Sequence, residues 1–180
     1  SKESAANTLS RMKQELTYGP WHQEKGTLFR QEIAAVAVLN STAIQPVFSD
    51  SGCTVWMDGE FYNRAEVAQK VGCNPESDAE LLHDMFQSAD SRSALADLDG
   101  IYSAAIYTGN NLHLLSDRNG LRPLCWTRTP TGIAWATELK AFLHLPGFDA
   151  SLDSESLEAF LGIGYLLENQ TWLKGVQRLA

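Results

Sequence analysis

The sequence predicts a single mixed α+β domain, and three patterns support that fold class. Apolar runs of strand length recur along the chain, two segments with helix-start signals lie between them, and the second half holds four short apolar segments separated by turn residues. The 180 residues are 44% hydrophobic, which suffices for one sizeable core but not for two ordinary domains. The residues alone therefore specify a layered α+β domain and no particular topology.

The first part of the chain predicts one helix followed by strands. Leu9, Met12 and Leu16 recur at helical spacing over 8–16, after a polar lead-in that has little to bury. The segment 29–39 predicts strand, because 33–38 form a nearly continuous apolar run of the kind that is buried on both faces of a sheet. A short strand at 45–48, a hairpin turn at 50–52 and a second strand ending at Met57 are expected next.

Two helices are predicted after this strand, each opened by a capping box. Asn63 and Glu66 have the required spacing, and the helix that they open is expected to end at Gly72. Ser77 and Glu80 repeat the pattern for the second helix. The side chains expected to face inward from it are those of Leu81, Leu82, Met85 and Phe86. Polar groups at a strand-to-helix junction often hold small ligands, so the stretch 58–63 is the first candidate site.

The second half predicts an antiparallel meander of four strands at 101–107, 112–115, 124–128 and 133–136. The stretch 88–93 is expected to be a polar connection before it. A helix is predicted at 137–145, and Asp153 is expected to cap a last helix with Leu157, Phe160 and Leu161 on one face.

Composition excludes several classes of function. The net charge of −8 and the 14 scattered Lys and Arg argue against a nucleic-acid surface. No apolar run approaches the roughly 18 residues of a membrane span, and no signal peptide is evident, so a soluble, cytoplasmic protein is expected. The three cysteines and four histidines lack disulfide or metal-ligand spacing, which predicts reduced thiols and no metal site.

Four motifs follow one another along the chain: Asp-Gly-Glu-Phe-Tyr-Asn at 58–63, Ser-Asp-Ala-Glu at 77–80, Ser-Asp-Arg-Asn-Gly-Leu-Arg-Pro-Leu at 116–124 and Thr-Glu-Leu-Lys-Ala at 137–141. In order and spacing they resemble the class II glutamine amidotransferase domain that opens asparagine synthetases. The resemblance covers roughly residues 12–180, and the family includes β-lactam synthetase and the lasso-peptide cyclases, whose amidotransferase domain has lost its chemistry. It implies a four-layer αββα sandwich of the N-terminal-nucleophile type, with two mostly antiparallel sheets. It also divides the chain into an amidotransferase-like domain at 1–150 and, at 151–180, a linker and the start of an absent synthetase domain.

The resemblance implies that Asp58, Gly59, Glu60 and Asp78 bind substrate, and it assigns no catalytic residue. The family's first residue is a cysteine nucleophile, whereas this chain begins with Ser1. Ala34 stands eleven residues before Gln45, where the family has the arginine that binds the substrate carboxylate. Arg30 could replace that arginine only in a different register.

Asp58 stands where the family uses an asparagine to help form the oxyanion hole. A carboxylate there offers no donor and carries the wrong charge, which leaves the Gly59 N–H alone. The departures at Ser1, Ala34 and Asp58 together predict a degenerate site.

Structural roles compete with these assignments. The structural role open to Asp58 and Glu60 is to cap the helix expected at Asn63, and Asp78 interacts favourably with its own helix dipole with or without a ligand. Asp117 and Arg118, with Gly120, are interpreted as a structural turn and ion pair. Cys53 is interpreted as a core residue. Trp56, Trp126 and Trp135 are interpreted as packing in the core or on a sheet face, and not as a stacking platform for a ligand. Leu157 and Phe160 could pack on a second domain.

The leading hypothesis is a catalytically impaired N-terminal domain of an ATP-dependent, asparagine-synthetase-like amide ligase. ATP and Mg²⁺ would then belong to the synthetase half and no cofactor to this chain. Its partner would be its own C-terminal synthetase domain or a separate synthetase subunit, and a homodimer and glutamine binding stay open. One alternative is a competent glutaminase whose cysteine-bearing strand is missing from this chain. The other is a non-catalytic amino-acid-binding module that uses Glu60 and Asp78.

Overall fold

The computed structural model of the chain describes residues 2–17, 19–29, 33–39, 44–50, 52–109 and 111–179. The helices and strands follow in this order: α1 (Lys2–Leu16), β1 (Gln23–Phe29), β2 (Ala34–Leu39), β3 (Val47–Phe48), β4 (Cys53–Phe61), α2 (Arg64–Val71), α3 (Asp78–Phe86), α4 (Ala89–Arg92), η1 (Ser93–Asp97), β5 (Gly100–Thr108), β6 (Leu112–Ser116), β7 (Cys125–Thr129), β8 (Gly132–Ala136), η2 (Leu139–His144), α5 (Ser154–Ile163) and β9 (Val176–Arg178). Elements η1 and η2 are 3₁₀ helices.

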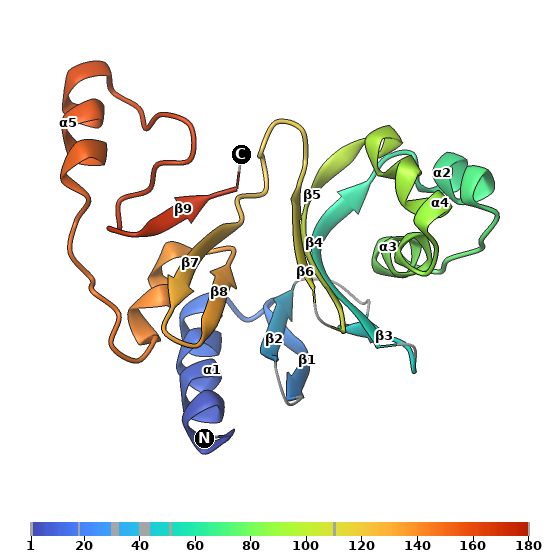
Figure 1. Cartoon of the computed structure of the whole chain (residues 1–180), viewed down its shortest axis with the longest axis horizontal. Coiled ribbons are helices and arrows are strands. Elements are labelled where there is room, and N and C mark those ends of the chain that lie inside the picture. The colour runs from blue at the N-terminus through green and yellow to red at the C-terminus, as the bar shows by residue number, and fades with distance from the viewer. Residues whose placement is uncertain are drawn as a thin grey trace.

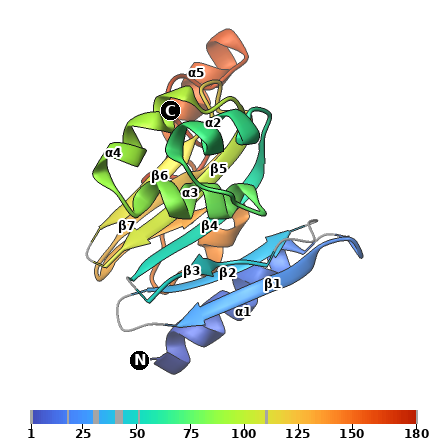
Figure 2. The ribbon, with the colours of Figure 1, turned by 90° about the vertical axis from the view of Figure 1, so that its right-hand side faces the viewer.

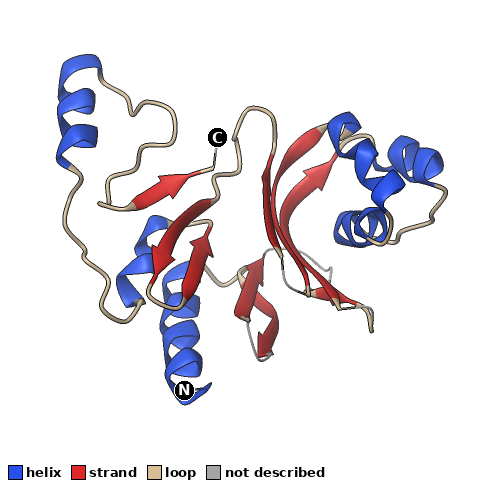
Figure 3. Ribbon diagram, viewed as in Figure 1, coloured by secondary structure: helices blue, strands red, loops and turns tan. Residues whose placement is uncertain are grey.

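The elements stack in four layers. All strand pairs are antiparallel, and the sheets have the orders β1-β2, β3-β4-β5-β6 and β8-β7-β9. Helices α2, α3 and α4 cover one face of the four-stranded sheet, whose other face looks toward the strands of the two smaller sheets (Figures 1 and 2). Helix α1 contacts β2 and η2 on the far side of those strands, and Figure 3 shows the same alternation of helix and strand layers. The predicted αββα sandwich is confirmed.

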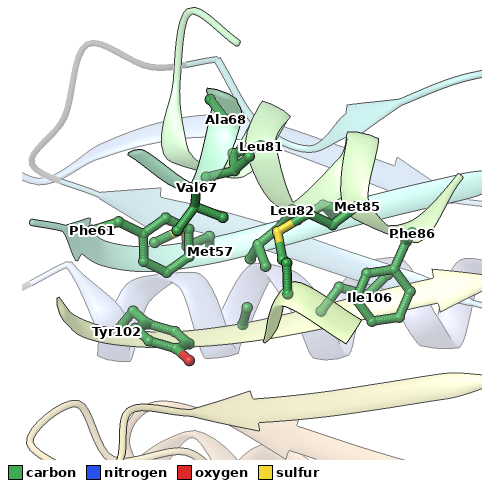
Figure 4. Packing of buried hydrophobic residues seen from close by; sticks show 14 of the residues in the cluster. Met57, Phe61, Val67, Ala68, Leu81, Leu82, Met85, Phe86, Tyr102 and Ile106 are labelled. Atoms are coloured by element: carbon green, nitrogen blue, oxygen red, sulfur yellow. The ribbon is translucent and has the colours of Figure 1, made fainter. Parts of the chain in front are cut away.

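The largest core lies between β4, β5 and helix α3 (Figure 4). Val55 and Met57 alternate on the face of β4 that meets the helix, and Leu81, Leu82 and Met85 of α3 are fully buried against it. Burial of each such side chain contributes about 1.5–3 kcal/mol. The predicted inward face of α3 is therefore confirmed, as is its N-cap, because the Ser77 hydroxyl accepts a hydrogen bond from the Glu80 N–H at 3.2 Å.

Strand β4 corrects the prediction that a strand ends at Met57. It continues through Phe61, with Asp58 opposite Ser103 and Gly59 opposite Tyr102 on β5. Local polarity suggested a strand end, but these residues lie where β4 extends beyond its short partner β3, which pairs only with residues 54 and 55.

Asn63 does not form the predicted capping box, because its side chain makes no cap hydrogen bond. The Asn63 side chain instead donates to the Asp97 carbonyl at 2.8 Å and accepts from the Asp99 N–H at 3.0 Å. These long-range contacts tie the start of α2 to the segment that enters β5. Gly72 does end α2, with a left-handed φ of 79°.

The predicted four-stranded meander is wrong in its pairing. Strands β5 and β6 form one hairpin and β7 and β8 another, but β6 and β7 belong to different sheets. The loop between them carries the chain from one sheet to the other, and it is held by the Asp117 carboxylate as described below.

Other boundaries also differ from prediction. Helix α1 begins at Lys2, the segment before Ala34 includes a separate strand β1, the stretch expected to be a polar connection contains α4, and η2 is a 3₁₀ helix. The hairpin turn before β4 is present, with the Gly52 N–H donating to the Ser49 carbonyl at 3.1 Å.

The last thirty residues contain α5 and return to the sandwich at β9. The Asp153 side chain caps α5 as predicted, accepting from the Ser156 N–H at 2.9 Å. Strand β9 pairs with β7, and the Leu179 N–H donates to the Leu124 carbonyl at 2.8 Å. The proposed boundary at residue 150 stays a prediction. Within the described residues, none of the helices is long and apolar enough to cross a membrane.

Candidate functional site

The candidate site lies along the edge of β4 that extends beyond β3. The buried Gln45 side chain takes the place of a neighbouring strand there: its amide oxygen accepts from the Met57 N–H at 2.7 Å, and its amide nitrogen donates to the Met57 carbonyl at 2.6 Å. Four residues farther along, the Phe61 N–H donates to Asp78 Oδ2 at 3.2 Å. Two side chains distant in sequence thus anchor this edge, with Asp58, Gly59 and Glu60 between the anchors.

Gly59 has a backbone that only glycine adopts without strain. Its φ is +116°, and a Cβ placed there would lie 2.0 Å from the Ile101 carbonyl oxygen on β5. A side chain would therefore push β4 and β5 apart. This accounts for glycine at the centre of the site independently of any ligand.

Asp58 places its carboxylate beside Gly59, on the same strand face as Trp56. Asp58 Oδ2 lies 3.6 Å from Arg122 Nη1, and the two side chains are 30% and 49% exposed. An ion pair this exposed contributes about 0–1 kcal/mol. Asp58 is therefore an anion paired by a guanidinium from another loop, and it does not cap α2, whose N-cap residue makes no side-chain cap bond.

Asp78 reaches the end of β4 from the first turn of α3. Besides accepting from the Phe61 N–H, it lies 3.3 Å from Arg64 Nη1 and is only 17% exposed. Glu60 is exposed on the strand. The structure thus brings all four predicted binding residues to one strand end, but Asp78 is held by protein groups and Asp58 by Arg122.

The loop that carries Arg122 is built around Asp117. The Asp117 carboxylate is buried and accepts hydrogen bonds at 3.0 Å from the backbone N–H groups of Asn119, Leu121 and Arg122. Burial acts to raise the pKa of Asp117, but these hydrogen bonds outweigh it and hold that pKa below its usual value. The predicted turn is confirmed. The predicted ion pair is not, because backbone groups bind the carboxylate and Arg118 is exposed.

A cavity of about 640 Å³ opens beside Asp58, between α1 and the sheets. Ala34 and Gln45 line it together with Asp58, so positions far apart in the sequence meet in one space. The Ala34 side chain carries no charge. Ser1 and Arg30, the other two residues considered for the substrate site, lie outside the described part of the chain. Among the described residues, Asp58 is the only charged side chain that lines the cavity.

The three cysteines lack the environment of an activated thiol. Burial raises the pKa of each: Cys53, Cys73 and Cys125. Cys53 and Cys125 are buried, and no cysteine lines the cavity within the described ranges. Cys53 is a core residue, as predicted. The described residues also hold no cluster of three His, Cys, Asp or Glu that could bind a metal ion.

Sequence reasoning missed two contributors to the site. Arg122 lies in the motif at 116–124, and the sequence indicates only that it belongs to a loop rich in turn residues. Ser103 lies opposite Asp58 on β5, and nothing in its local sequence distinguishes it from other strand residues.

Comparison with known proteins identifies the family. A family model described as a glutamine amidotransferase domain matches residues 2–180. A protein of Methanocaldococcus jannaschii named as asparagine synthetase [glutamine-hydrolyzing] 1 is 30% identical over 118 residues, which are 61% of this chain and 21% of the relative. Asparagine synthetase [glutamine-hydrolyzing] 3 of Bacillus subtilis is 27% identical over 119 residues, 62% of this chain and 19% of the relative. The chain thus spans about a fifth of these relatives.

Solved structures also match part of the chain. Glutamine phosphoribosylpyrophosphate amidotransferase from B. subtilis, complexed with ADP and GMP, is 26% identical with a TM-score of 0.46, over 55% of this chain and 25% of that one. A structure described as the allosteric regulatory enzyme of purine biosynthesis is 26% identical with a TM-score of 0.47, over 56% and 25%. Because the family model matches nearly the whole length, the chain belongs to the glutamine amidotransferase domain family.

Proposed function

We propose that this domain has lost efficient glutamine hydrolysis and serves as the N-terminal part of an ATP-dependent, asparagine-synthetase-like amide ligase. The observation that carries the proposal is the carboxylate of Asp58 beside Gly59, paired with Arg122 at 3.6 Å. Amide hydrolysis develops negative charge on the carbonyl oxygen, which needs hydrogen-bond donors. Loss of one such donor raises the barrier by about 2.7–4 kcal/mol, and a carboxylate in its place repels the developing charge as well.

Ala34, which lines the same cavity as Asp58, supports the same proposal. Its methyl group cannot bind the carboxylate of glutamine, whereas a guanidinium forms two parallel, charge-assisted hydrogen bonds. Two arginines of the described chain lie at the site and contact carboxylates there, Arg122 at Asp58 and Arg64 at Asp78. Neither arginine is among the described residues that line the cavity beside Ala34.

A synthetase segment is the proposed partner, and α5 is its proposed contact. The relatives are named as asparagine synthetases, and this chain spans about a fifth of them. On α5 and the loop after it, large apolar side chains are exposed: Leu157, Phe160, Leu161, Ile163, Tyr165 and Leu167. Exposed large apolar side chains concentrated in one segment are typical of an interface. ATP and Mg²⁺ would be bound by the synthetase segment.

Restoration of the missing groups tests the proposal. In the full-length protein with its natural N-terminus, Asp58→Asn combined with Ala34→Arg is expected to raise the rate of glutamate release from glutamine above that of the unmodified protein. Asp90→Asn, which removes an exposed carboxylate on α4 without touching the site, should leave the rate unchanged. An unmodified protein that hydrolyses glutamine as fast as the double variant would favour the competent glutaminase instead.

A further inference from the structure

The cavity beside Asp58 has the character of a small-ligand site. Its volume of about 640 Å³ lies within the range of roughly 300–1,000 Å³ that small-molecule pockets occupy. Its walls are mainly apolar, with Leu9 and Met12 from α1, Ala105 from β5, and Ile133 and Trp135 from β8. Such walls fit the aliphatic or aromatic body of a ligand.

The lining of this cavity also includes charged and polar side chains. Asp58 is its only charged lining residue in the described chain, and the guanidinium that pairs with Asp58 is nearly half exposed and 3.6 Å away. Ser103 lies directly across from Asp58 on β5 and also lines the cavity. The Ser103 hydroxyl is buried in a residue only 2% exposed, and it has no hydrogen-bond partner in the described chain. A carboxylate and an unpaired hydroxyl therefore adjoin on one sheet face.

We infer that this cavity binds a small molecule with a primary ammonium group on an apolar body. The ammonium has three donors and a positive charge, which suit the Asp58 carboxylate and the Ser103 oxygen, while the body packs against Met12, Ile133 and Trp135. An anionic head group would meet the Asp58 carboxylate with like charge. The inference goes beyond the proposed loss of hydrolysis, because it concerns binding by groups that remain.

Two sources could supply this ammonium group, a free amine and an apolar amino acid. They differ at Arg122, whose guanidinium lies 3.6 Å from Asp58 Oδ2: the carboxylate of an amino acid bound at Asp58 would contact this guanidinium, whereas an amine has no group to place there. Binding of a matched pair of ligands, with and without a carboxylate, distinguishes the two.

Calorimetric titration of the full chain at pH 7 with three matched probes tests the inference. Isoamylamine has the side chain and ammonium group of leucine without the carboxylate, and isocaproate has the side chain and carboxylate without the ammonium. Leucine and isoamylamine are expected to bind and isocaproate is not. If leucine binds more tightly than isoamylamine, the ligand is an amino acid. If isoamylamine binds more tightly, the ligand is a free amine. Absence of heat for both at millimolar concentration, or equal binding of isocaproate, would overturn the inference.

Substitutions in the cavity lining test whether the probes bind in this cavity. Asp58→Asn is expected to weaken both ammonium ligands by at least about tenfold, a free-energy loss of about 1.4 kcal/mol, while Asp90→Asn changes neither. Ala34→Leu keeps Asp58 but fills part of the cavity, so it should also weaken both. Arg122→Gln should weaken leucine alone. Unchanged binding in both Asp58→Asn and Ala34→Leu would contradict the assignment, whatever the rate of glutamine hydrolysis.

Discussion

Arg122 Nη1 lies 3.6 Å from Asp58 Oδ2 and joins the loop after β6 to the edge of β4. The loop crosses from one sheet to the other, and the Asp117 carboxylate fixes its backbone through three N–H groups, one of which belongs to Arg122. A buried anion thus positions a cation, and that cation pairs with the carboxylate that stands beside Gly59. The geometry of the site depends on how the two sheets are connected.

Asp117→Asn should destabilise the domain by about 1.5–3 kcal/mol at pH 7, because hydrogen bonds to a charged group are lost and an amide N–H₂ faces a backbone N–H. The pKa of Asp117 lies below its usual value in the folded state, so its contribution is full above about pH 4 and is lost as the pH falls further. Urea unfolding of both proteins between pH 7 and pH 2.5 measures this. A gap in unfolding free energy that does not narrow below pH 4 would refute the assignment.

Gly59→Ala should cost about 3 kcal/mol or more, since the new Cβ would lie 2.0 Å from the Ile101 carbonyl oxygen at a left-handed φ. Gly72→Ala is the matched control, because it also has a positive φ but no atom within 4 Å of the added Cβ. It should cost about 1–2 kcal/mol. Chemical denaturation gives the loss of unfolding free energy in each variant. The loss in Gly59→Ala includes both the steric clash and the backbone strain, whereas that in Gly72→Ala reflects the backbone strain alone. Equal losses would mean that β4 and β5 tolerate a side chain at Gly59.

Gln45→Ala should destabilise the domain by about 2–4 kcal/mol, because it leaves both the N–H and the carbonyl of Met57 without their partner in a buried position. Gln69→Ala, on the exposed face of α2, should change stability by less than about 0.5 kcal/mol. Thermal unfolding of both variants, followed by circular dichroism, gives the comparison. Similar midpoints would show that Gln45 does not substitute for a neighbouring strand.

Leu161→Asp should leave the stability of this chain almost unchanged, since Leu161 is 75% exposed on α5. In the full-length protein it should lower the thermal midpoint or separate the unfolding of the two parts, because the apolar contact proposed for α5 would then bury a charge. Calorimetric scans of both forms test this. A full-length protein as stable as its unmodified form would argue against α5 as the contact.

Local sequence patterns predicted the helix whose N-cap and buried face are formed by nearby residues. They failed where contacts with residues distant in sequence determine the side-chain conformation. Leu81, Leu82 and Met85 recur at helical spacing and are buried as predicted, and Ser77 caps their helix. Asn63 carries the same kind of capping signal, yet its side chain bonds to residues more than thirty positions away, which a local pattern cannot reveal.

The strand pairing and the site likewise depend on contacts between residues distant in sequence, which local patterns do not reveal. The strand patterns of β6 and β7 were found, but alternation along a strand says nothing about which sheet receives it, so one meander was predicted instead of two hairpins. Polar Asp58 and Glu60 suggested the end of a strand, although they lie within β4. The resemblance located the site, while the Arg122 contact and the unpaired Ser103 hydroxyl needed coordinates.

The rate of glutamate release from glutamine by the unmodified, full-length protein tests the central claim most directly. With saturating glutamine, and with or without ATP, we expect a rate no higher than that of glutamine in buffer, because the proposal has Asp58 in place of an oxyanion-hole donor and Ala34 in place of a carboxylate-binding arginine. Release above that background, abolished by a thiol-alkylating reagent, would contradict the claim.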